Sequence, residues 1–288
     1  MKNSFTLFLL MLSAFYCHSQ SFIDYHNTCN SACELMSKGK YKAATDSLKK
    51  AISSVDKPFA KDIFNLAKCY SQLNEKDSCI YYLETAMDMM DINYLLESHK
   101  LWFEPLLGID KWSEITSRIF QPPPLVEKQQ IILIEKLRDI SKLDQHYRKI
   151  LTDSIKVWHY DDTTIINIYR DSVKYNDEIA QKEMEDVINT YGWPCQEICN
   201  YQGVNPGTFL VHASDAWFQK MNTKLLHEIE IGNLSPNNYA MIADRIRLRN
   251  NLSPLYNSYS AFNNELTEEV ANNCRKIGLA LPQFRDCR

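Results

Sequence analysis

Two stretches of the N-terminal region share one pattern. They are ACELMSKGKYKAATDSLKKAI, residues 32–52, and AKCYSQLNEKDSCIYYLETAM, residues 67–87. A constant offset of 35 residues aligns Ala32 with Ala67, Ala44 with Cys79, Leu48 with Leu83 and Ala51 with Ala86. Small side chains at such positions let two helices approach closely. Gly39 supplies a tight turn between the two helices of the first stretch, and Pro58 marks its end.

This period resembles that of tetratricopeptide repeats, in which helical hairpins of about 34 residues stack on one another. A weaker third unit follows at 94–120. It resembles the terminal element of many bacterial tetratricopeptide proteins through Trp102, Phe103, Leu106, Leu107 and Trp112. The resemblance implies a short helical stack over residues 22–120. Such a stack either binds a protein or peptide in its groove or only supports the rest of the chain.

The proline run QPPPL marks a domain boundary, because consecutive prolines cannot continue a helix. We therefore expect a linker at 121–126 and a second domain at 127–288. Apolar residues recur at spacings of three to five from Val126 to Leu143, which predicts a long amphipathic helix. Gly192 and Gly232 suit helix ends, and Ser235 and Thr267 suit helix starts. No segment alternates with the period of a strand. The predicted fold is all-α, with a short tetratricopeptide-like helical stack followed by an irregular helical domain.

The N-terminus has the layout of a secretory signal peptide over residues 1–19, with cleavage before Gln20. Its apolar run, Phe5 to Phe15, is shorter than the ~20 residues that a membrane span needs. A lipid anchor on Cys17 is the weaker alternative, because bulky Tyr16 stands where a small residue is required. We expect an exported protein, periplasmic or extracellular, that does not span the membrane.

The charge of the chain argues against one class of partner. The net charge is −4, the pI is about 6.0, and no long basic run occurs. A nucleic-acid-binding protein needs clustered Lys and Arg to neutralise phosphates. We therefore expect no nucleic-acid partner.

Eight cysteines follow Cys17, and an even number in an exported chain permits disulfides. Buried thiols are the alternative, because Cys packs as a small apolar residue. A zinc site would need the pairs Cys29/Cys33 and Cys195/Cys199 to converge. The sequence contains no glycine-rich phosphate loop, no H-E-x-x-H and no G-x-S-x-G. We expect no metal site and no cofactor.

The stretch GTFLVHASDAWFQK, residues 207–220, holds the first candidate site residues. It is predicted as one helix opened by Pro206, with His212, Asp215 and Gln219 at positions i, i+3 and i+7. This spacing places the three side chains on one stripe. A His–Asp pair can act as an oriented general base, but the same pattern is common on helix surfaces.

Charged residues on two other helices complete the set of candidates. Asp244 and Arg245 are adjacent and point about 100° apart, so only one of them reaches a given site. An interhelical salt bridge is the competing interpretation. Arg148 and Arg245 can each hold an anionic ligand, because a guanidinium matches a carboxylate or phosphate in a bidentate fork. Asp144 and Arg148 form an i, i+4 pair, which by itself stabilises a helix and is not counted as a site.

Several short motifs of the second half occur in a characteristic order. They are DQHYR (144–148), YGWP (191–194), HASDAWFQ (212–219), NNYAMIADRI (237–246) and CRKIGLALP (274–282). Together they resemble a family of mostly bacterial proteins with a domain of unknown function, over about 127–288. The chain departs from that family at Val211, at Asp215 and in PLYNSYS, residues 254–260. The family implies the location of a site and no reaction.

These observations leave two functional hypotheses. The first is an exported binding or scaffold protein of the bacterial cell envelope that uses its tetratricopeptide-like repeats. The second is an enzyme or small-ligand-binding domain with a polar cleft around His212, Asp215, Asp244 and Arg245. Convergence of those four side chains would favour the second hypothesis, and their dispersal would count against it.

Overall fold

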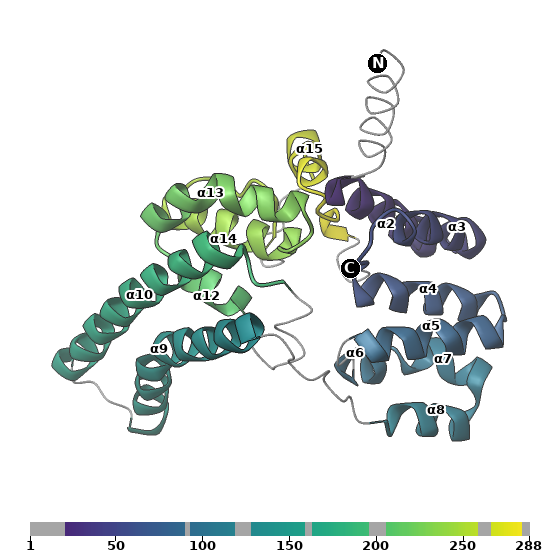
Figure 1. The fold of residues 1–288 in the computed structure, drawn as a ribbon, viewed down its shortest axis with the longest axis horizontal. Coiled ribbons are helices and arrows are strands. Elements are labelled where there is room, and N and C mark those ends of the chain that lie inside the picture. Colours follow the sequence, from purple (N-terminus) through teal and green to yellow (C-terminus); the bar gives the residue numbers. More distant parts are fainter. Residues whose placement is uncertain are drawn as a thin grey trace, which may run out of the picture. The chain divides into compact units, whose positions relative to one another are not determined.

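The computed structural model describes residues 21–89, 93–118, 128–158, 163–195, 206–258 and 266–283. All regular secondary structure in these ranges is helical, as predicted (Figure 1). No helix in the described ranges is long and apolar enough to cross a membrane. The predicted signal peptide at 1–19, which includes Cys17, and the predicted linker at 121–126 lie outside the described residues.

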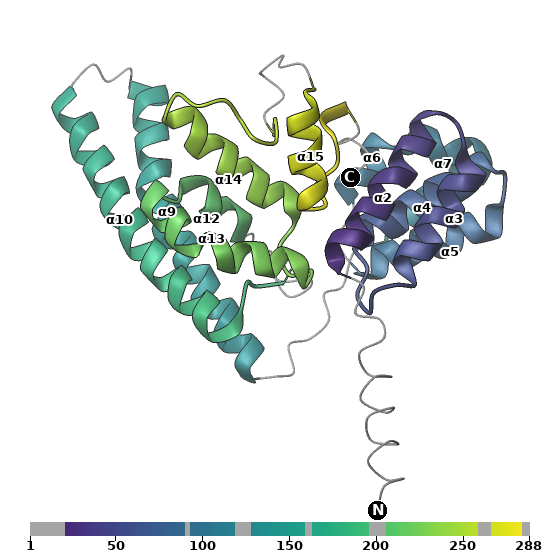
Figure 2. The same cartoon turned by 90° about the horizontal axis from the view of Figure 1, so that it is seen from above.

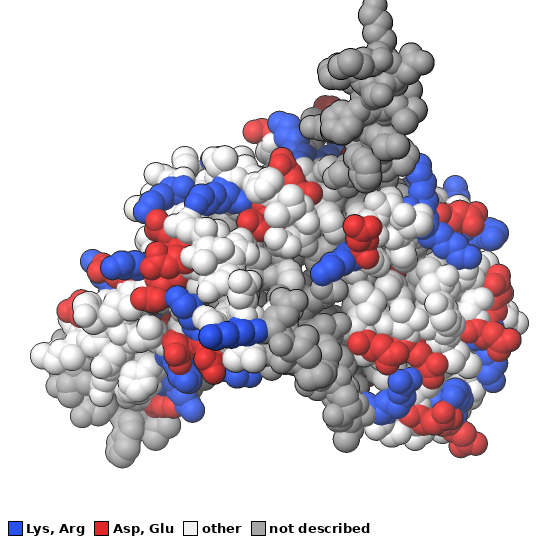
Figure 3. All heavy atoms as spheres, viewed as in Figure 1, with Lys and Arg blue, Asp and Glu red and all other residues white. Residues whose placement is uncertain are grey.

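The chain divides into two compact units. The first comprises residues 1–87, 92–118 and 278–288, and the second comprises 88–91 and 119–277. Residues 278–288, which the predicted second domain includes, thus group with the first unit. Basic and acidic side chains are interspersed over the face shown in Figure 3.

The first unit consists of short helices. They are α2 (Phe22–Ser37), α3 (Tyr41–Ile52), α4 (Ala60–Gln72), α5 (Lys76–Met89), α6 (Asn93–Ser98), α7 (Lys100–Leu107) and α8 (Ile109–Thr116). The 35-residue offset recurs in the turns between α2 and α3 and between α4 and α5. Gly39 and Asn74 both have left-handed backbone, with φ of 69° and 64°. The Lys40 amide donates to the Leu35 carbonyl as the Glu75 amide does to Tyr70.

The small residues of the repeat lie where these helices cross. Ala32, Ala67, Ala44 and Cys79 are fully buried. Burial also raises the pKa of the Cys79 thiol to about 12, so the thiol is protonated at neutral pH. Close helix packing therefore accounts for the small side chains. Membership of the tetratricopeptide repeats stays a prediction.

The two ends of the first unit are closed differently. At one end, Phe103 of α7 is fully buried and stacks on Trp112 of α8. At the other end, Gly278 and the residues after it pack on α2, and the Asn30 amide donates to the Gly278 carbonyl at 3.1 Å. Gly278 has φ of 70°, and a Cβ there would lie 2.7 Å from the Cβ of His26. Only glycine fits this contact.

The second unit is built on a long antiparallel hairpin, visible in Figures 1 and 2. Its helices are α9 (Lys128–Trp158), α10 (Thr163–Tyr191), α12 (Pro206–His212), α13 (Asp215–Glu230), α14 (Pro236–Arg249) and α15 (Glu268–Lys276). The hairpin core between α9 and α10 is apolar and consists of Leu133, Ile134, Leu137, Ile140, Ala180, Met184, Val187 and Ile188. Helix α12 packs on α9 and α14, and α13 packs on α14.

The prediction of one helix over residues 207–220 is wrong. Helix α12 ends at His212, and α13 begins at Asp215. Ser214 adopts extended backbone, and its hydroxyl accepts a hydrogen bond from the Trp217 amide. This N-cap satisfies a donor that the start of α13 would otherwise leave open. His212 and Asp215 therefore belong to different helices.

Candidate functional site

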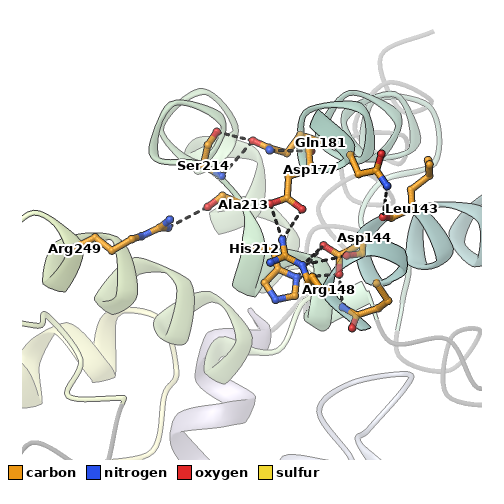
Figure 4. Close-up of polar contacts among 11 residues, drawn as sticks. Leu143, Asp144, Arg148, Asp177, Gln181, His212, Ala213, Ser214 and Arg249 are labelled. Atoms are coloured by element: carbon orange, nitrogen blue, oxygen red, sulfur yellow. Dashed lines mark hydrogen bonds and ion pairs between the residues drawn. The ribbon is translucent and has the colours of Figure 1, made fainter. Parts of the chain in front are cut away.

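The centre of the candidate site is a contact between α9 and the end of α12. Nδ1 of His212 lies 2.8 Å from both carboxylate oxygens of Asp144 (Figure 4). Asp144 continues the apolar stripe of Leu137 and Ile140, so α9 turns its carboxylate toward the inside of the second unit. The Asp144 side chain is only 3% exposed, whereas that of His212 is 17% exposed.

The buried Asp144 carboxylate is supported by neighbours on its own helix. The Gln145 side-chain amide donates to Oδ2 of Asp144. Nε of Arg148 donates to the Asp144 carbonyl at 3.0 Å and lies 3.8 Å from its Oδ1. Burying a carboxylate is costly unless such partners satisfy it, so these contacts offset the cost of burying Asp144.

Arg148 connects this group to α10. Its Nη2 donates to both carboxylate oxygens of Asp177 at 2.5 Å. Burial raises the pKa of Asp177, and the hydrogen bond and positive charge of Arg148 oppose that rise. The guanidinium is therefore occupied by a carboxylate of the chain itself.

Gln181 holds the break between α12 and α13 against α10. Its side-chain oxygen accepts from the Ser214 amide at 3.2 Å and also from the Ser214 hydroxyl. Its carbonyl accepts from the indole N–H of Trp217 at 3.0 Å. These bonds hold the chain directly after Ala213, two residues beyond His212 (Figure 4). The position of the imidazole is thus set by contacts on two helices.

The remaining predicted site residues do not join this cluster. Asp215 lies 3.4 Å from Arg249 and accepts from the Asn250 amide at 2.6 Å. Gln219 is exposed and Arg245 is half-buried. The convergence of His212, Asp215, Asp244 and Arg245 that would favour the second hypothesis is not found among the contacts of the described residues, which counts against a cleft built from those four side chains. Arg148 is the one predicted residue that meets His212, and it does so through Asp144.

Asp244 is fully buried and has a different role from either predicted one. It accepts from the backbone amides of Leu255, Tyr256 and Ser258 and from the Ser258 hydroxyl, at 2.7 to 3.0 Å. These partners lie in the loop after α14, so the prediction of an interhelical salt bridge is wrong. The loop has no regular secondary structure to pair these backbone amides. The buried carboxylate of Asp244 supplies the acceptors that they need.

Four residues of the cluster are absent from the predicted site residues, namely Asp144, Gln145, Asp177 and Gln181; the sequence identifies Asp144 only as a helix partner of Arg148. Asp177 and Gln181 lie on α10 and contact the site only because α10 packs antiparallel to α9. Asn176 gives the one sequence signal for this region. It is a polar residue at a buried position of the apolar stripe of α10, as Asp144 is on α9. Its side chain donates to the Leu143 carbonyl.

The described residues contain no group of three or more His, Cys, Asp or Glu side chains arranged to hold a metal ion. Cys29, Cys33, Cys69, Cys79 and Cys274 are buried, and Cys195 is half-buried. Cys199 and Cys287 lie outside the described ranges, so the predicted choice between disulfides and thiols stays open.

The cluster can act as a proton acceptor. When Asp144 accepts from Nδ1–H of His212, the lone pair of Nε2 is left for an incoming group. No hydrogen bond to Nε2 is present among the described residues. Comparison with known proteins adds no further assignment, since no family model, curated protein or solved structure matches this chain. The geometry of the site is therefore the basis for assigning a function.

Proposed function

We propose that the second unit binds a small polar substrate at His212 and acts on it by general acid–base chemistry. The contact that carries this proposal is the one between Nδ1 of His212 and the buried Asp144. A carboxylate at Nδ1 fixes the tautomer and the ring orientation, and it stabilises the imidazolium that forms when Nε2 takes a proton. The proton would come from a substrate hydroxyl or from a water molecule.

The charges around His212 favour a neutral substrate over an anionic one. The nearest guanidinium, that of Arg148, is paired with both oxygens of Asp177. It therefore does not offer a fork to an external carboxylate or phosphate, as the sequence prediction for Arg148 requires. Asp144 adds a negative charge directly behind the imidazole, which also disfavours an anion at Nε2.

Hydrolysis of p-nitrophenyl acetate, a neutral activated ester, tests this proposal. His212→Gln keeps an amide that can reach Asp144 but has no basic nitrogen. We expect it to lower the protein-dependent rate by about 100-fold, the lower range for general acid–base catalysis. His227→Gln is the matched control, because His227 is exposed on α13, away from Asp144, and its ring pairs with Glu230. Equal rates for wild type and His212→Gln would contradict the proposal.

We also propose export to the bacterial cell envelope, on the layout of residues 1–19. The test is N-terminal sequencing of the chain recovered from the periplasm of an expressing bacterium. A mature N-terminus at Gln20 is the expected result. An intact Met1 would contradict cleavage of a signal peptide. An N-terminus at a lipidated Cys17 would show export with a lipid anchor instead.

Protein or peptide binding by the first unit is a second proposal, favoured by an aromatic surface on α4 and α5. Tyr81 is 63% exposed and contacts half-buried Tyr82, which stacks on buried Tyr70 with ring centroids 5.3 Å apart. An exposed tyrosine on a fixed aromatic support is typical of a binding hot spot. Peptides selected from a random display library should lose binding to Tyr81→Ser. Selected peptides that bind both forms equally would contradict this second function.

A further inference from the structure

Residues 278–281 contact the first unit without forming a helix of its stack. Helix α15 ends at Lys276, and residues 279–281 have no regular secondary structure. Leu279 and Ala280 are nevertheless only 4% and 2% exposed. These residues follow a helix of the second unit in the chain but group with the first unit. They therefore lie on the helical stack in the way that a bound peptide would.

Helix α2 contacts this segment through a face that is distinct from its core face. The core residues of α2 are Tyr25, Cys29, Ala32, Cys33 and Met36. Ile23, His26 and Asn30 follow the spacing i, i+3, i+7 and form a second stripe. At about 100° per residue, this stripe lies roughly 110° around the helix from the core residues. We call Ile23, His26 and Asn30 the outer face of α2.

The outer face recognises the backbone of the segment at Gly278. A Cβ on Gly278 would lie 2.7 Å from the Cβ of His26 and 3.3 Å from the carbonyl oxygen of Ile23. The side-chain amide of Asn30 donates to the Gly278 carbonyl at 3.1 Å. Neither contact requires a particular side chain on the segment. The outer face can therefore accept any peptide that presents a glycine in this register.

Asn30 is only half satisfied by the segment. An asparagine side chain offers both a donor and an acceptor to a peptide backbone. Its Nδ2 binds Gly278, but its Oδ1 is buried and accepts no hydrogen bond from the described residues. A buried acceptor without a donor weakens the complex that buries it. A peptide that places a donor beside Oδ1 would therefore bind this face better than the segment does.

We propose that the outer face of α2 is a peptide-binding site and that residues 278–281 occupy it as a displaceable internal ligand. The external partner is an apolar peptide with a glycine between large aliphatic residues, as in Ile277-Gly278-Leu279, and with a donor for Asn30. Because the internal ligand is tethered, it competes at a high effective concentration. The first unit is then closed to such peptides until the segment is displaced. This site is separate from the Tyr81 surface of α5.

Fluorescence anisotropy of a labelled peptide with the sequence RKIGLALPQ, residues 275–283, tests the proposal. In the full-length chain, Gly278→Ala adds the Cβ that collides with α2 and so loosens the internal ligand. We expect the peptide to bind Gly278→Ala about tenfold more tightly than it binds the wild type. Gly39→Ala is the matched control, because Gly39 has the same left-handed backbone but a Cβ there meets nothing within 4 Å. It should bind the peptide no better than the wild type.

Two further substitutions in the Gly278→Ala chain locate the bound peptide. Asn30→Ala should weaken binding about fivefold, because one hydrogen bond is lost. Tyr81→Ser should leave the affinity unchanged. A loss of binding with Tyr81→Ser, or none with Asn30→Ala, would place the peptide elsewhere and overturn the proposal.

The single variant can also overturn it. Equal binding to wild type and Gly278→Ala would show that the segment does not block the site, and no binding to Gly278→Ala would show that there is no site. A loss of helix content by circular dichroism in Gly278→Ala, but not in Gly39→Ala, would make the segment a fixed part of the fold.

Discussion

Asp144 and Asp244 are both buried aspartates on helices of the second unit, and each belongs to a motif that the sequence singles out. Their partners differ. Asp144 contacts the side chains of Gln145, Arg148 and His212, whereas the acceptor bonds of Asp244 go to backbone amides and one hydroxyl. The donors that Asp244 binds all belong to the loop after α14, so Asp244 stabilises the fold of that loop. A half-buried imidazole has a second nitrogen, so Asp144 can serve chemistry.

The largest expected effect distinguishes the two aspartates by stability. Asp244→Ala should lower the free energy of unfolding by about 3–4 kcal/mol, because several buried donors lose a charged acceptor together. Urea unfolding followed by circular dichroism measures this. Asp244→Asn retains one carbonyl acceptor and should lose less. A loss below about 1 kcal/mol for Asp244→Ala would contradict a structural role for Asp244 and its contrast with Asp144.

A smaller stability effect and a distinct spectroscopic one are expected at the other aspartate. Asp144→Asn should cost about 1–2 kcal/mol, since an amide still fits the site and fewer donors depend on it. Its main effect falls on His212, because an amide can donate as well as accept and no longer enforces protonation at Nδ1.

The ¹⁵N shifts of the neutral His212 ring report this change. In the wild type, Nδ1 should carry the proton and Nε2 should not. Asp144→Asn should shift both nitrogens toward averaged values. Asp215→Asn is the matched control, because Asp215 contacts Arg249 and Asn250 and should leave the ring unchanged. Identical ring shifts in wild type and Asp144→Asn would place Asp144 in the same structural class as Asp244.

The sequence predicts the helix ends of the second unit well because their chemistry is local. Gly192 and Gly232 have φ of 76° and 83°, and Ser235 caps α14 with its hydroxyl. Thr267 caps α15 in the same way. In each case a single residue type supplies a backbone conformation or an acceptor that few others can. Such signals do not depend on what packs nearby.

The break between α12 and α13 could not be predicted in that way. Serine is found both inside helices and at their starts. The role of Ser214 as an N-cap is decided by its bonds to Gln181 of α10. Helical periodicity alone therefore predicts one helix that contains both His212 and Asp215. The site is only partly predictable, because its contacts also depend on how the helices pack. The sequence identifies His212 and Arg148, but Asp177 meets Arg148 only through the packing of α9 on α10.

The smallest expected effect is the pH dependence contributed by Asp177, which sharpens the difference between the two regions. Burial raises the pKa of Asp177 above its ordinary value of 3.8, so the folded chain binds this proton more tightly than the unfolded chain. The contribution of Asp177 to stability is therefore full below the unfolded pKa and is lost as the pH rises through the folded pKa. Asp177→Asn should flatten the profile of unfolding free energy against pH in this acidic range by less than about 1 kcal/mol. Asp244→Asn, as the comparison variant, should lower stability without removing that slope. A profile that Asp177→Asn leaves unchanged would show that Asp177 does not contribute to the pH dependence of stability.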